Sequence, residues 1–151
     1  MVTRYFDGAA SAGSCGVGMV LLVNSSQSYR LRMDVGYGLN TKSELLALWG
    51  LLHFALHKNY QTLHVHEDSK VIIEWVKGIY YIRFVELEHW LIRTKFLIKQ
   101  FNSLSFQHIY REFNSLVDDL SKRAIVPRFK KICWWEFLDD ALIESGTLSL
   151  F

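Results

Sequence analysis

Apolar and polar residues alternate strictly over residues 29–35. A period of two is typical of a strand with one solvated face. Residues 2–7 and 17–23 are apolar runs of strand length, and glycine-rich or serine-rich stretches separate the three segments. We therefore predict three strands joined by short turns, which form an antiparallel meander.

The spacing becomes helical after Gly36. Leucines recur at helical intervals from residue 41 to about residue 58, and Thr41 with Glu44 forms a capping-box pattern. Further patterns predict, in order, a strand at 63–66, helices at 71–78 and 85–101, a strand at 104–110 and a helix at 114–124. The order strand-strand-strand-helix-strand-helix-helix-strand-helix predicts an α/β fold. Its five-stranded mixed sheet would join the antiparallel meander to two parallel strands, with helices flanking the sheet.

Composition indicates a single globular domain. Of the 151 residues, 50% are hydrophobic and 15% aromatic, which argues against disorder. We expect a domain at 1–127 and a C-terminal tail at 128–151 that packs on it. No apolar run approaches the roughly 20 residues that span a bilayer, and the first residues do not form a signal peptide. We therefore expect no membrane association and an intracellular location, nuclear or cytoplasmic. The net charge of +2 is compatible with nucleic-acid binding without requiring it, and two unpaired thiols are expected at Cys15 and Cys133.

Four acidic residues are expected to converge. Asp7 and Asp68 end two strands that a right-handed crossover would place side by side. Glu44 lies in the first turn of the crossover helix, and Asp118 lies on the last helix. Four carboxylates together would repel and raise one another's pKa values. Divalent cations would resolve that conflict, and oxygen ligands suit Mg²⁺ or Mn²⁺ rather than zinc.

Each of these residues also has an ordinary structural interpretation. Alone, Asp7 would be a turn former, Glu44 the capping partner of its helix and Asp68 the N-cap of the next helix. Asp118 would be one of two adjacent surface acids. The hypothesis of a site depends on the four residues together.

Four segments, in this order, resemble those of ribonuclease H domains, most closely the type carried by plant non-LTR retroelements and their stand-alone relatives. They are residues 6–9, 43–48, 67–69, and 110–114 with 118–121. The resemblance implies a ribonuclease H fold with two Mg²⁺ ions (Mn²⁺ as an alternative), about 3.5–4 Å apart. It assigns the catalytic metal ligands to Asp7, Glu44, Asp68 and Asp118. The implied reaction is endonucleolytic hydrolysis of the RNA strand of an RNA–DNA hybrid, leaving 3′-hydroxyl and 5′-phosphate ends.

The resemblance also implies contacts with the nucleic acid at Gly8, Ala9, Asn40, Ser69, Lys70 and Asn114. Many relatives carry an auxiliary histidine on a loop before the last helix. This chain lacks that loop, so Arg111 is the candidate for the auxiliary task, and His108 is expected inside a strand in a structural role. The basic insertion that many such enzymes carry between the second and third helices is also absent, which implies weaker hybrid binding or a fused or associated reverse transcriptase. We expect a monomer.

Two alternatives remain open. A catalytically degenerate domain of retroelement origin would keep the fold as a nucleic-acid-binding module or scaffold. Another nuclease of the same fold is disfavoured, because exonucleases of this kind have an acidic residue where Ala9 stands and integrases have Glu where Asp118 stands. In the tail, Trp134 and Trp135 are expected in core packing rather than base stacking.

Overall fold

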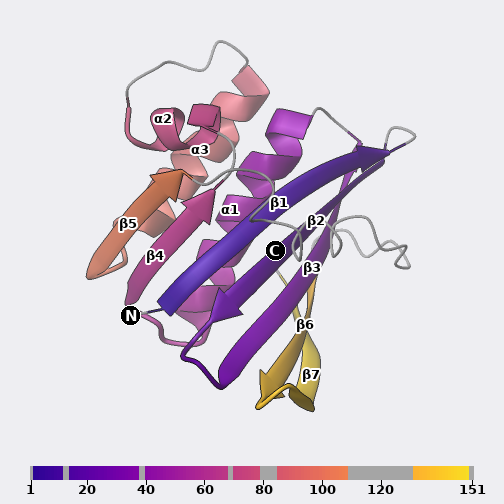
Figure 1. The fold of residues 1–151 in the computed structure, drawn as a ribbon. Coiled ribbons are helices and arrows are strands. Elements are labelled where there is room, and N and C mark those ends of the chain that lie inside the picture. Colours follow the sequence, from indigo (N-terminus) through magenta and orange to yellow (C-terminus); the bar gives the residue numbers. More distant parts are fainter. Residues whose placement is uncertain are drawn as a thin grey trace.

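A computed structural model of the chain describes residues 2–11, 14–37, 40–67, 70–78, 85–108 and 131–149. These residues form one mixed sheet with helices packed on it (Figure 1). The strands are β1 (Val2–Ser11), β2 (Ser14–Leu22), β3 (Gln27–Tyr37), β4 (Thr62–Glu67), β5 (Ser103–His108), β6 (Lys131–Leu138) and β7 (Ala141–Ser149). The helices are α1 (Asn40–His57), α2 (Lys70–Val76) and α3 (Val85–Ile98).

The predicted sheet arrangement is confirmed for the first five strands. β1, β2 and β3 form an antiparallel meander, β4 pairs parallel with β1, and β5 pairs parallel with β4. α1 makes the crossover from β3 to β4. The order across the whole sheet is β5-β4-β1-β2-β3-β6-β7, so the five-stranded prediction was wrong by two strands.

The two additional strands come from the C-terminal tail. β6 pairs antiparallel with β3, and β7 pairs antiparallel with β6. A two-residue turn joins them at Asp139 and Asp140, whose φ values are 50° and 64°. Two successive positive φ values define a turn whose twist matches that of a hairpin. Burial also alternates along β6, with Ile132 and Trp134 inside and their neighbours less buried.

Several predicted boundaries shift. β1 does not end at Asp7 but continues to Ser11, and among the described residues its pairing beyond Phe6 is with β2. The helix predicted to reach residue 101 ends at Ile98. The strand predicted at 104–110 begins at Ser103 and is described as far as His108, because residues 109–110 lie outside the described residues. α2 is closed as predicted by Gly78, whose φ of 76° is the left-handed conformation usual after a helix. The helix predicted at 114–124 lies outside the described residues.

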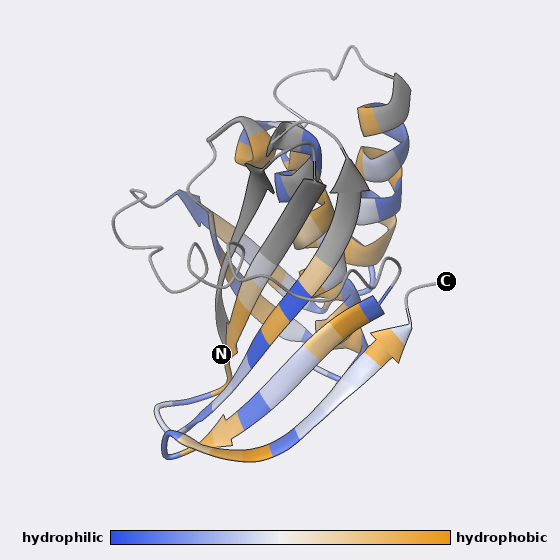
Figure 2. Ribbon diagram, turned by 90° about the vertical axis from the view of Figure 1, so that its right-hand side faces the viewer, coloured by the Kyte–Doolittle hydropathy of each residue, from blue (hydrophilic) through white to orange (hydrophobic). Residues whose placement is uncertain are grey.

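The core lies between one face of the sheet and the helices. Met19, Leu31 and Ile132 come from three adjacent strands and are fully buried, as are Leu48 and Leu52 of α1. α3 packs on α1, where the rings of Trp49 and Trp90 meet edge to face with centroids 5.2 Å apart. Figure 2 shows apolar and polar residues alternating along the strands. No helix in the described part of the chain is long and apolar enough to cross a membrane.

The C-terminal hairpin belongs to this core. Trp134 is only 8% exposed and meets the rings of Tyr29 and Phe54, each with centroids 6.1 Å from its own. The ammonium group of Lys58, just after α1, lies 4.2 Å from the centre of a Trp134 ring. Polar contacts add to this packing, because Gln27 Nε2 donates a hydrogen bond of 3.0 Å to Glu136 Oε2. Core packing of Trp134 is therefore confirmed.

Gly146 makes room for that tryptophan. It is the cross-strand partner of Trp134. A Cβ atom at position 146 would lie 2.7 Å from Cζ2 of the indole, closer than non-bonded carbon atoms can approach. The indole can therefore lie over β7 only because residue 146 has no side chain.

Candidate active site at the β1–β4 edge

The parallel pairing of β1 with β4 places Asp7 beside the C-terminal end of β4. The register runs from Val2 opposite Leu63 to Phe6 opposite Glu67. In the sequence, Asp7 directly follows Phe6 and Asp68 directly follows Glu67. Asp7 is also held from its other side, since it pairs with Gly18 of β2. The backbone of Asp7 is thus held by β2, one residue after the last described pair with β4.

Glu44 approaches the sheet from α1. It lies one turn into the helix and is half-buried, directly before the buried run Leu45–Leu48. These leucines attach the helix to the sheet, and α1 packs against β1, β2 and β3. The position of Glu44 therefore depends on buried packing, which agrees with the prediction that this carboxylate belongs to the inward side of the helix.

The remaining predicted ligands are not described. Asp68 and Asp118 lie outside the described residues, and so do Ser69, Arg111 and Asn114. The described side chains do not include that of Asp7. The proposed convergence of four carboxylates therefore stays a prediction that the β1–β4 register and the place of Glu44 support.

The backbone of the other predicted contact residues can be placed. Gly8 and Ala9 lie within β1, opposite Val17 and Gly16 of β2, and not in the loop predicted after Asp7. Asn40 is the first residue of α1, and Lys70 is the first residue of α2. Both are therefore at helix N-termini, where backbone N–H groups without a partner in the helix are found.

The donor chemistry of the proposed site fits a hard divalent cation. Its four predicted ligands are all carboxylates, and oxygen-only donors favour Mg²⁺ or Mn²⁺. Within the described part of the chain, no group of three or more His, Cys, Asp or Glu residues forms a metal site. Only Glu44 among the proposed ligands has a described side chain, so the fit depends on ligand type and on the strand register.

Histidines also gather on β4 and β5. His64 hydrogen-bonds through one ring nitrogen to Ser105 Oγ and through Nε2 to Gln107 Oε1 at 3.0 Å. The ring of His66 meets that of His64 edge to face, with centroids 4.7 Å apart. Burial, followed by the nearby His64, lowers the pKa of His66. His66 is therefore favoured in its neutral form.

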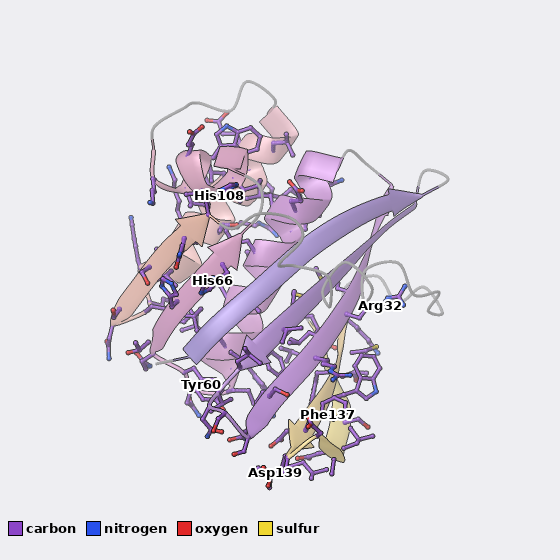
Figure 3. All side chains as sticks on the ribbon, viewed as in Figure 1. Arg32, Tyr60, His66, His108, Phe137 and Asp139 are labelled. Atoms are coloured by element: carbon purple, nitrogen blue, oxygen red, sulfur yellow. The ribbon has the colours of Figure 1, made fainter. Side chains whose placement is uncertain are left out.

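His108 lies in β5, as predicted, and is the last residue of that strand that the structure describes. It is exposed and pairs with Glu67, one residue before Asp68 (Figure 3). His108 therefore lies near the end of β4, beside the predicted site, although the role expected for it was structural.

Solved structures share this fold. The chain superposes on the RNase H1 of the halophilic archaeon Halobacterium salinarum with a TM-score of 0.75 and 24% identity, covering 80% of this chain and 93% of that one. LC11-RNase H1, isolated from compost and solved in complex with an RNA/DNA hybrid, gives a TM-score of 0.74 and 23% identity over 83% of this chain and 96% of its own. A prototype foamy virus protease-reverse transcriptase gives 0.62 and 17% identity, over 80% of this chain and 20% of its own.

Sequence comparison gives the family. No curated protein matches the chain. A family model described as reverse transcriptase-like matches residues 5–124, which include most of β1, all of β2 through β5 and all four predicted carboxylates. The chain therefore belongs to the reverse transcriptase-like family and has a ribonuclease H-like fold.

Proposed function

We propose that this protein is a divalent-metal-dependent endonuclease that hydrolyses the RNA strand of RNA–DNA hybrids and leaves 3′-hydroxyl and 5′-phosphate ends. The observation that carries the proposal is the β1–β4 register, which fixes Asp7 directly after the last parallel pair. Asp68 follows the other member of that pair in sequence. The half-buried Glu44 and the shared fold support the same conclusion.

In this proposal Asp7, Glu44, Asp68 and Asp118 would hold two Mg²⁺ or Mn²⁺ ions, and Asp7 and Asp68 would contribute to both. Bound divalent cations supply a water of lowered pKa and offset the charge of the reacting phosphate. Glu44 would also contact the 2′-hydroxyl region of the RNA, and Asp118 would hold the metal on the side of the attacking water. Arg111 and His108 are alternative candidates for assisting product release.

Recognition would depend on shape rather than on base sequence. Gly8 and Ala9 have little or no side chain, so an RNA sugar edge can approach β1 closely. Asn40, Ser69, Lys70 and Asn114 would contact the sugar-phosphate backbone. A-form geometry and 2′-hydroxyl groups distinguish the RNA strand in such a site. We further propose that a fused or associated reverse transcriptase supplies hybrid binding, in keeping with the family and a retroelement origin.

The test uses labelled RNA–DNA hybrid, single-stranded RNA and double-stranded DNA, each with Mg²⁺ and with EDTA. We expect cleavage of the RNA in the hybrid only, and only with the cation. Asp68→Asn and Glu44→Gln should abolish it, because each removes a charged oxygen ligand. Glu88→Gln, on the exposed face of α3, is the matched control and should cleave at the wild-type rate.

Each result separates the competing functions. Cleavage that persists in EDTA, or in Asp68→Asn, would show that the proposed carboxylates are not the active site. Metal-independent hybrid binding without any cleavage would instead support the degenerate binding module. The 5′ ends are identified with a kinase that requires a free 5′-hydroxyl. The fragments should be labelled only after phosphatase treatment, which shows that they carry 5′-phosphates.

A further inference from the structure

Among the residues whose side chains the structure describes, large exposed apolar side chains occur at two places. One place is the outer face of α3. The other is the end of the β6–β7 hairpin. Because single soluble domains rarely keep contiguous apolar patches in water without a partner, each place is a candidate contact surface.

The first surface, here called the α3 stripe, consists of Ile92 and Phe96 with Lys95 and Lys99. Ile92 is 62% and Phe96 66% exposed. Residues four apart lie on the same helix face, so the two side chains form a continuous apolar strip. Lys95 and Lys99 are each three residues after one of them and border the strip with positive charge. Glu88 is the acidic residue described near its N-terminal end.

The second surface, here called the hairpin tip, consists of Leu138, Leu142 and Ile143 with three acids. The exposed fractions of these apolar residues are 43%, 57% and 53%. Asp139 and Asp140 form the turn, and Glu144 follows on β7, all of them exposed. Ile143 has no cross-strand partner, because the register shifts between Glu136 and Phe137. Such a bulge bends the strand and redirects its side chains.

The two surfaces are complementary to each other and not to themselves. Each presents two or three apolar side chains, but the α3 stripe is bordered by lysines and the hairpin tip by carboxylates. Contact between two tips would bring six acids together, and contact between two stripes would bring lysines together, which costs free energy. Contact between a stripe and a tip would pair opposite charges around a shared apolar centre.

We propose that the α3 stripe of one copy binds the hairpin tip of a second copy. The contact cannot form within one chain, because α3 packs beside α1 and α2 whereas the hairpin extends the opposite side of the sheet beyond β3 (Figures 1 and 3). The association is therefore head-to-tail, and each added copy leaves one stripe and one tip free. The surfaces are small, so the contact is weak and salt-sensitive, and the monomer is the form present at low concentration.

Sedimentation velocity tests the proposal on the full chain. We expect the weight-average mass of the wild type to rise with concentration and to fall on addition of salt. Phe96→Glu disables the stripe and leaves the tip, whereas Leu142→Lys disables the tip and leaves the stripe. Each variant alone should remain a monomer. Mixed together, they should form a one-to-one dimer that grows no further, because only one intact stripe and one intact tip remain.

One further variant tests the charges of the tip, and a second variant serves as the control. Asp139→Asn with Asp140→Gly removes the turn charges while keeping a sequence that favours this turn, and it should weaken association. Lys77→Glu changes an exposed lysine after α2 and should leave association unchanged. A circular dichroism spectrum that matches that of the wild type confirms that each variant is folded.

The outcomes are decisive. A wild type that stays monomeric at every concentration, or variants that still associate alone, would overturn the proposal. So would a mixture of the two variants that does not form a heterodimer. None of these outcomes bears on hybrid cleavage, since neither surface includes a proposed metal ligand.

Discussion

Replacing Trp134 by alanine should remove the main attachment of the C-terminal hairpin to the domain. The indole is 8% exposed and meets two aromatic rings edge to face or tilted, Tyr29 and Phe54. Truncating a buried tryptophan typically costs about 3–5 kcal/mol through lost burial and the cavity left behind. A domain of this size is stable by about 5–15 kcal/mol, so the variant should lose a large part of its stability.

Trp135→Ala is the matched control for this prediction. The two tryptophans are adjacent, but strand alternation puts Trp135 on the other face of β6, where it is only half-buried. Its replacement removes the same number of atoms from a less buried position. We expect Trp135→Ala to cost less than half as much as Trp134→Ala.

The free energy of unfolding is measured by urea denaturation of the wild type and both variants, followed by circular dichroism. Amide hydrogen exchange on β6 and β7 shows whether the hairpin opens separately from the rest of the domain. A double-mutant cycle with Lys58→Met should give a coupling of about 0.5–1 kcal/mol, the usual strength of an exposed cation–π contact. If Trp134→Ala costs less than about 1 kcal/mol, or no more than Trp135→Ala, then the hairpin is not held by this packing and the reasoning fails.

Three further predictions concern other parts of the molecule. Gly146→Ala should destabilise the protein by about 1–3 kcal/mol in urea denaturation, because its Cβ has no room beside the Trp134 indole; an unchanged midpoint would contradict this. Burial lowers the pKa of His53 in the folded protein. As the pH falls through the ordinary histidine pKa of about 6.5, the unfolded chain therefore binds a proton at His53 before the folded protein does. Stability should then fall as the pH decreases from about 7 toward 5, and His53→Gln should fall less steeply, whereas equal pH dependence of the two proteins would argue against the burial. Finally, Mg²⁺ should raise the melting temperature of the wild type in differential scanning fluorimetry but not that of Glu44→Gln, and an equal rise in both would exclude Glu44 as a ligand.

Much of the fold was predictable because the spacing of apolar residues differs between strands and helices. The alternating segment at 29–35 and the leucine repeat after residue 44 each indicate one element without ambiguity. Parallel pairing of β1 with β4 followed from the handedness of crossovers. These are local or topological rules, and they placed Glu44 on α1 and Asp7 beside the end of β4.

The C-terminal hairpin was not predictable by the same rules. The adjacent tryptophans interrupt the appearance of alternation, since one is buried and the other lies on the opposite face. The Asp139-Asp140 turn lacks the glycine that usually marks a two-residue hairpin. Pairing with β3 is also a long-range contact that no local pattern contains. The extension of β1 past Asp7 was not predicted for a similar reason. Gly8 and Ala9 have the composition of a loop, and they are in a strand because β2 pairs with them.

The pairing of β6 with β3 has a consequence for the order in which the chain is made. The two strands lie far apart in sequence, as the hydrogen bond between Gln27 and Glu136 over 109 residues illustrates. During synthesis, β3 can pair with β2 early, but its other edge stays without its partner until β6, which comes much later in the sequence, has been made. An open strand edge can pair with other nascent chains. Arg30 and Arg32, which lie along that edge, place positive charges there during this interval and would disfavour such pairing until the hairpin closes the sheet.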